Sequence, residues 1–263
     1  MIEEVALPAD ALLSLEIRSE FRVADAAVGD AVEAVLRGDI AGYSRNDIVA
    51  YYLLTMVTRA FSSMPGLSGG IARSVRDGSI KKYLVQPVDF IASLLAARIA
   101  HKLVYYVVAL LPFGAVFYVC RGYFPAAPDA VTIAAYLLSL VLSFLLGFFM
   151  EATLGMLGFW FLEVSSIIFA YMLVQYLLSG HMFPIDMLAG IPTGIPGTTA
   201  ADLVRWLPFE YTAYFPAAVW LGKIRGADLA RDLAIEAAWV VVMAVACRIA
   251  WWRGTHRYSA FGG

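Results

Sequence analysis

Few residues in this sequence have the types and spacing that chemistry needs. No stretch matches G-x-x-x-x-G-K-[ST], the loop that cradles nucleotide phosphates, so we expect that the chain does not bind and hydrolyse ATP alone. The pattern H-E-x-x-H is absent as well, and His101, His181 and His256 lie in three different segments. Two cysteines, Cys120 and Cys247, make neither a metal site nor a disulfide scaffold. The sequence therefore predicts no metal site in this chain.

One short pattern is compatible with nucleophilic catalysis. The stretch 66–69, Gly-Leu-Ser-Gly, resembles the G-x-S-G motif of rhomboid-type intramembrane serine proteases, which pair a serine with a histidine from another span. Ser68 lies at the edge of a basic loop, however, and neither His101 nor His181 is placed in the rhomboid order. We therefore predict no catalytic residue and keep this protease as an alternative.

The elements that carry these residues are apolar blocks. Of the 263 residues, 61% are hydrophobic and 15% are charged, and the mean hydropathy is +0.75. Residues 103–120, 130–150 and 164–185 contain no Asp, Glu, Lys or Arg. Each block is close to the ~20 apolar residues that cross a bilayer as a helix. Backbone groups in lipid must pair internally, so we predict an all-α, multi-pass membrane bundle.

We expect five clear spans, and we divide the chain into two parts. Residues 1–47 are a charge-rich segment with no apolar run long enough to cross, and residues 48–263 form the membrane domain. Arg59 interrupts the first span, so it should lie near an end or face protein. A Pro- and Gly-rich region, 184–228, separates the last two spans and includes a short apolar segment that is re-entrant or interfacial. The expected spans are 48–63, 90–120, 130–159, 165–183 and 233–252.

Orientation follows from the distribution of Lys and Arg in short loops. The loop 68–89 and the tail after residue 252 carry most of these residues, so both should face the cytoplasm. This places region 184–228 outside, and it places residues 1–47 outside unless they hide a span. We therefore expect a multi-pass protein of the cell (inner) membrane with a cytoplasmic C-terminus. The net charge of −2 gives no argument for nucleic acid as a partner.

The basic loop also has helical periodicity. Ile71, Val75 and Ile80, with Tyr83 and Leu84, suit a short amphipathic helix that is broken at Gly78 and stopped by Pro87. Such a helix lies flat under the membrane, either as a basic anchor or as a docking element for another protein.

Here the sequence resembles the type-2 ABC transporter permeases, in their six-span branch. The resemblance covers roughly residues 42–263. Its motifs are R-x-G-x-[ILV]-x(3)-L-x-x-P-V at 76–88, Gly-His-Met-Phe-Pro at 180–184, Leu-Pro-Phe-Glu-Tyr at 207–211, Phe-Pro at 215–216, and the ending 257–263.

The resemblance implies a transport function. A coupling helix after the family's second span docks on a separate ABC ATPase subunit, which holds ATP and Mg²⁺, and no cofactor is expected on this chain. Two permeases, identical or sister chains, pair within membrane lipid and export a substrate. The implied coupling residues are Arg73, Arg76, Gly78, Lys81, Lys82 and Pro87, and the implied pathway or outer-gate residues are Glu151, Gly180, Phe183, Pro184, Pro208 and Glu210.

One departure from the family pattern concerns the N-terminus. Six spans are expected in the family, and the first should occupy about residues 20–40, where this chain is rich in charge. A secondary transporter, the third alternative, should show internal repeats, and the sequence has none.

The remaining membrane charges suit several roles. Glu151 lies mid-span, where it lines a pathway, pairs across a dimer or packs by hydrogen bonding to Ser or Tyr. Glu163 and Lys102 are expected at loop ends, and Arg248 is expected to extend to the inner surface. The glycines of the third span favour close helix packing; they are Gly147, Gly155 and Gly158.

Overall fold

The computed structural model describes residues 42–124 and 128–258. The chain divides into two units, residues 1–45 and 46–263. Apart from Arg45, the first residue of α2, the described helices lie in the second unit. The predictions for residues 1–47 therefore fall almost entirely outside the described residues.

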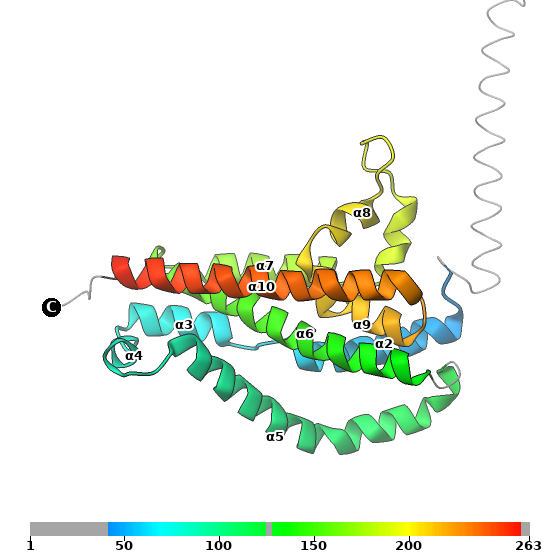
Figure 1. Cartoon of the computed structure of the whole chain (residues 1–263), viewed down its shortest axis with the longest axis horizontal. Helices are drawn as coiled ribbons and strands as arrows, with labels where there is room; N and C mark the ends of the chain where they lie inside the picture. Colours follow the sequence, from blue (N-terminus) through cyan, green and yellow to red (C-terminus); the bar gives the residue numbers. More distant parts are fainter. Residues whose placement is uncertain (1–41, 125–127, 259–263) are drawn as a thin grey trace, which may run out of the picture. The chain divides into compact units, whose positions relative to one another are not determined.

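The prediction of an all-α protein is confirmed: the described residues form helices and contain no strand beyond an isolated bridge between Pro192 and Thr199 (Figure 1). The helices are α2 (Arg45–Ser62), α3 (Leu67–Arg76), α4 (Lys81–Val85), α5 (Phe90–Val119), η1 (Arg121–Tyr123), α6 (Ala130–Met156), η2 (Leu157–Phe159), α7 (Ser165–Leu178), η3 (Ile185–Gly190), α8 (Ala200–Arg205), η4 (Pro208–Thr212), α9 (Tyr214–Trp220) and α10 (Gly226–Arg257).

Three of the described helices are long and apolar enough to cross a bilayer: α5, α6 continued by η2, and α10. Helix α7 is apolar but has 14 residues, which at 1.5 Å per residue is about 21 Å. It ends before the predicted residue 183 because Gly180 adopts φ +82°, a left-handed conformation that stops a helix. Helix α2 has 18 residues and carries Arg59 in its last turn.

Helix α6 is the centre of the bundle and contacts α10, α3, η4 and α9. Its three glycines lie where other backbones come close, as predicted. A Cβ on Gly147 would overlap the carbonyl of Ser62, one on Gly155 would lie 2.8 Å from both Ile71 Cβ and Ser68 O, and one on Gly158 would lie 2.9 Å from Ala72 Cα. Any side chain at these positions would separate α6 from α2 and α3.

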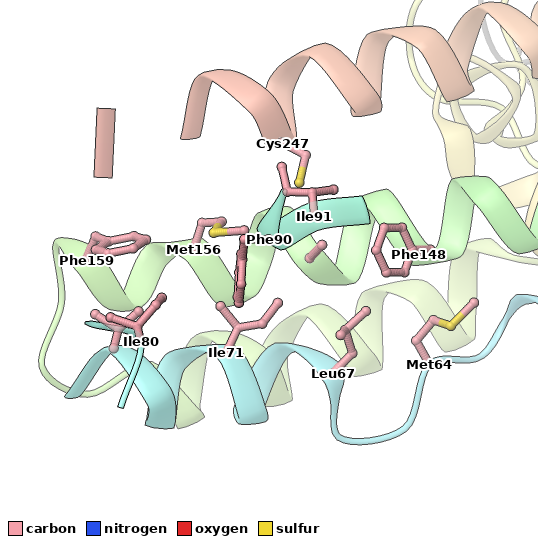
Figure 2. Packing of buried hydrophobic residues seen from close by; sticks show 12 residues of the cluster. Met64, Leu67, Ile71, Ile80, Phe90, Ile91, Phe148, Met156, Phe159 and Cys247 are labelled. Atoms are coloured by element: carbon pink, nitrogen blue, oxygen red, sulfur yellow. The ribbon is translucent and has the colours of Figure 1, made fainter. Parts of the chain in front are cut away.

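The main hydrophobic core lies where α3, α6, α10 and the start of α5 meet (Figure 2). Phe90 of α5 stacks on Trp251 of α10, with ring centroids 4.4 Å apart, and Tyr83 meets Phe90 edge-on at 4.9 Å. We call the region of this core the α4 end. We call the region formed by η3, α8, η4 and α9 the α9 end. The fully buried members at the α4 end include Leu67, Ile80, Phe148, Met156 and Cys247.

Helix α5 contacts the other helices mainly through its first half. Pro112 lies inside the helix, and Figure 1 shows α5 bending along its length. Beyond Tyr106 most side chains are exposed, Val107 and Leu111 by 78% and 79%.

One sequence prediction for a charged residue is wrong. Lys102 was expected at a loop end, but it lies within α5 and is 7% exposed, since its ammonium group caps carbonyls at the end of α2. The side chain of Arg248 is 54% exposed and forms an ion pair with Asp89, the residue that caps the N-terminus of α5. The guanidinium holds the pKa of the Asp89 carboxyl below its usual value.

Candidate functional site

Helix α3 begins the candidate coupling element. It starts after Gly66, which adopts φ +73°, and its buried face consists of Leu67, Ile71 and Val75. Arg73 and Arg76 lie on the opposite, exposed face. The sequence pattern thus correctly separated the packed face of α3 from its basic face.

Helix α4 presents basic and apolar side chains together. Gly78, with φ +75°, reverses the chain after α3, and Ile80 is then fully buried as an anchor. Lys81, Lys82 and Pro87 are exposed, as are three apolar neighbours: Leu84 by 42%, Val85 by 82% and Val88 by 51%. The sequence reading placed Leu84 among the apolar positions of this helix and did not single out Val85 or Val88.

Residues 63–66 form the break between α2 and α3, which we call the hinge. Lys102 Nζ donates to the carbonyl of Ala60 and, at 2.7 Å, to that of Ser63. Arg98 Nη1 donates to Pro65 O at 3.2 Å. Lys102 therefore satisfies a carbonyl at the C-terminus of α2, and both cations of α5 satisfy carbonyls of the hinge.

Glu151 of α6 reaches the first turn of α3. Its carboxylate accepts from the side chain and the backbone N–H of Ser68, with Arg98 nearby. Ser68 is 3% exposed, so its hydroxyl is engaged by a carboxylate in a closed position. This arrangement does not favour the serine protease alternative.

A cavity of about 390 Å³ lies between α2, α6 and α7. Its walls extend from the hinge and Glu151 to His181 and η4, and much of the lining is apolar. Arg59 Cζ lies 5.9 Å from the centre of the Tyr176 ring. The centres of the Tyr176 and His181 rings are 5.5 Å apart.

The 180–184 motif closes the cavity at its α9 end. The Tyr51 hydroxyl donates to the Gly180 carbonyl, and that of Tyr52 donates to Met182 O at 2.5 Å. A Cβ on Gly180 would lie 2.6 Å from Tyr214 Cβ, so the motif fits directly against α9. Phe183 is half-buried and Pro184 is buried.

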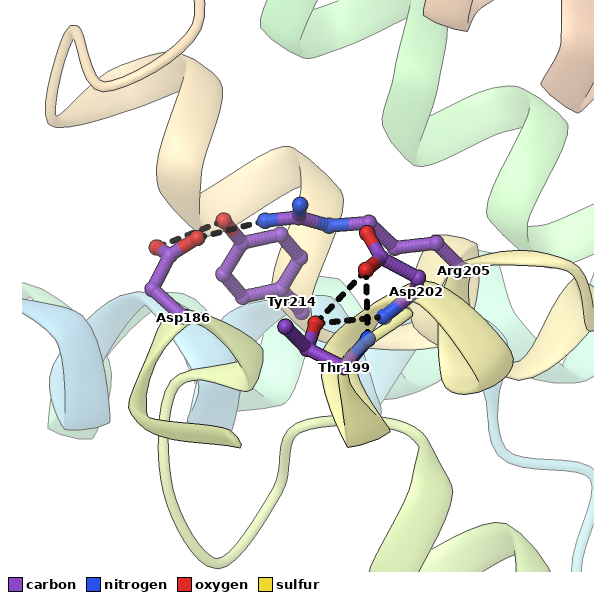
Figure 3. Close-up of polar contacts among 5 residues, drawn as sticks. All are labelled: Asp186, Thr199, Asp202, Arg205 and Tyr214. Atoms are coloured by element: carbon purple, nitrogen blue, oxygen red, sulfur yellow. Dashed lines mark hydrogen bonds and ion pairs between the residues drawn. The ribbon is translucent and has the colours of Figure 1, made fainter. Parts of the chain in front are cut away.

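A polar network holds the short elements of the α9 end (Figure 3). Asp186 of η3 accepts from Arg205 of α8 and from Tyr214 of α9, each at 2.7 Å. Thr199 and Asp202 form a reciprocal cap on the first turn of α8, with Thr199 N donating to Asp202 Oδ2 at 2.8 Å. Sequence reading missed the contacts of Asp186 because their members are separated along the chain and share no spacing. Thr199 and Asp202 do have the [ST]-x-x-[DE] spacing of a capping box, which was the available signal.

Pro208 begins η4, and Glu210 within it is 7% exposed. Burial raises the pKa of Glu210 to about 8 despite the nearby charge of Arg205. Glu210 lines a second cavity of about 490 Å³ together with Asp186 and Arg205. Within the described ranges 42–124 and 128–258, no three His, Cys, Asp or Glu residues gather as a metal site.

This arrangement defines a multi-pass membrane protein with an exposed helix of basic and apolar residues at one end and packed short helices at the other. The family model described as "ABC-2 family transporter protein" (ABC2_membrane_6) matches residues 35–262, so the chain belongs to this family and is a permease subunit of an ABC transporter. No curated protein and no solved structure gave a significant match to the chain.

Proposed function

We propose that the chain is the membrane-spanning subunit of an ATP-driven exporter, coupled through α3 and α4 to a separate ATPase subunit that holds ATP and Mg²⁺. The observation that carries this proposal is the exposed surface of α4. It places Lys81 and Lys82 beside Val85, while Ile80 fixes the segment to the core. Surfaces that combine apolar and cationic groups suit docking on a protein partner.

Movement at α4 requires a rigid connection to the spans. Helix α3 supplies it, because Gly155 and Gly158 allow close contact with α6 and the hinge joins α3 to α2. On this proposal, closure of two ATPase subunits around ATP displaces α4, and α3 transmits the displacement to α2 and α6. Two permeases, identical or sister chains, then open the cavity towards the outside of the cell membrane.

Reversing the charge of Arg76 tests the docking step. We expect Arg76→Glu to reduce stimulation of the ATPase subunit by about tenfold, because a charge mismatch at an interface costs more than a lost contact. Arg253→Glu is the matched control, since Arg253 is an exposed cation in the last turns of α10. Thermal unfolding should be the same in both variants. Equal stimulation by Arg76→Glu and the control would exclude α3 and α4 as the docking element.

Cysteine labelling in intact cells tests the orientation. The native cysteines are Cys247, which is buried, and Cys120, which ends α5 far from α4. We expect an impermeant maleimide to label Cys120 in intact cells, and to label Ser79→Cys in a Cys120→Ser background only after the cells are opened. Labelling of position 79 in intact cells would reverse the orientation and remove the proposed ATPase contact.

A further inference from the structure

The cavity between α2, α6 and α7 is lined by groups of both charges, which differ in the contacts they make within the protein. Three ionisable side chains line it: Arg59, Glu151 and His181. A charge at membrane depth is costly unless it is paired or meets water or a ligand, so the partners of each group decide what the cavity can hold.

Arg59 is the unpaired member. Its guanidinium stays protonated and offers five N–H donors. One neighbour is the Tyr176 ring, 5.9 Å from Cζ. Within residues 42–124 and 128–258, no carboxylate oxygen lies within the 4.0 Å of an ion pair. The ring contact satisfies one side of the guanidinium and leaves its hydrogen-bonding edge for another group.

The other charged groups near the cavity already have polar contacts within the protein. Glu151 accepts from Ser68 at the start of α3 and has Arg98 nearby. Arg98 and Lys102 are themselves engaged by carbonyls of the hinge. Arg59 is therefore the charged group of the lining whose N–H donors are left for a ligand.

The wall formed by α7 is apolar. Phe169, Met172 and Leu173 line the cavity, and these side chains are 63%, 55% and 52% exposed. We infer that this cavity binds amphipathic anions, with Arg59 contacting a carboxylate, phosphate or sulfate and α7 contacting the apolar body. The volume of about 390 Å³ lies within the range of ligand sites, ~300–1,000 Å³. The role of this selectivity in transport rests on the proposed function.

Fluorescent ligands that differ by one charge test the inference. The permease, with its ATPase subunit, is placed in nanodiscs of phosphatidylcholine and titrated with dansyl-labelled undecanoic acid or with its methyl ester. We expect the acid to bind at least about tenfold more tightly than the ester, because hydrogen bonds to charged groups are among the stronger ones. Arg59→Gln should reduce acid binding to the level of the ester, and Arg59→Lys should keep most of the preference.

Arg121→Gln is the matched control. Arg121 lies over a tyrosine ring as Arg59 does, 4.7 Å from the centre of Tyr118, but it lies outside the cavity. This variant should bind the acid as the wild type does. Circular dichroism and thermal unfolding of Arg59→Gln and Arg59→Lys separate loss of binding from loss of fold.

Such an anion can be a lipid headgroup or a free amphipathic acid. Replacing part of the phosphatidylcholine with phosphatidylglycerol distinguishes these two sources. Competition with the acid assigns the site to a lipid headgroup, and lack of competition assigns it to free amphipathic acids; both support anion binding. Equal affinity for acid and ester, or full acid binding by Arg59→Gln, would overturn the inference. The proposed function would survive that result if Arg76→Glu still reduced stimulation of the ATPase subunit.

Discussion

The α4 end and the α9 end border the same cavity but are held by different interactions. At the α4 end, α3 and α6 meet through glycines and a continuous apolar core that includes Phe90 and Trp251. At the α9 end, the buried apolar helix α9 packs on α6, and Asp186 joins η3 to α8 by an ion pair and to α9 by a hydrogen bond. Close apolar packing resists relative movement, whereas polar contacts can exchange with water. On the proposed function, the α4 end would act as the rigid lever, and η3 and α8 of the α9 end would be the elements that open.

The largest expected effect comes from adding one methyl group at the α4 end. Gly155→Ala places a Cβ 2.8 Å from Ser68 O and Ile71 Cβ, so α3 must move away from α6. We expect destabilisation of about 3 kcal/mol, the upper range for an overpacked core. Fluorescence of the six tryptophans during heating measures it.

Gly114→Ala is the control for this substitution. Gly114 is helical and has nothing within 4 Å of its added Cβ, so alanine should leave the unfolding temperature unchanged or raise it slightly. Equal unfolding temperatures for the two variants would contradict a glycine-dependent contact between α3 and α6.

A smaller loss of stability is expected when a contact of the polar network at the α9 end is removed. Asp186→Asn removes the charge that pairs with Arg205 and weakens the bond from the Tyr214 hydroxyl. A loss of about 2 kcal/mol is expected, as for hydrogen bonds to charged groups. Hydrogen exchange should rise in η3, α8 and α9 and stay constant in α3. A uniform rise over the whole chain would show that the two ends do not differ in the way described.

The smallest effect is local to α8. Thr199→Ala removes a side chain that accepts from Asp202 N at 3.3 Å and completes the cap of this helix. We expect a cost of about 1 kcal/mol, typical for loss of an N-cap. Exchange should increase in α8, with unchanged affinity for the ATPase subunit. Weaker ATPase binding by this variant would indicate that the polar end also contributes to docking.

Sequence reasoning predicted the long spans and the faces of α3, because apolar length and helical periodicity are local properties. It also placed Gly147, Gly155 and Gly158 at helix contacts, since small residues that recur along one membrane helix are typical of close helix packing. It could not find the partners of Lys102 or Asp186. Those contacts join residues from distant segments, and only the fold brings them together.

The bend in α5 has a consequence for how this protein tolerates different bilayers. Pro112 donates no backbone hydrogen bond, so the helix is weakened where it also leaves its neighbours. The first half of α5 is fixed to the hinge by Arg98 and Lys102. The second half can therefore change its tilt to match a thinner or thicker membrane without transmitting that change to the hinge.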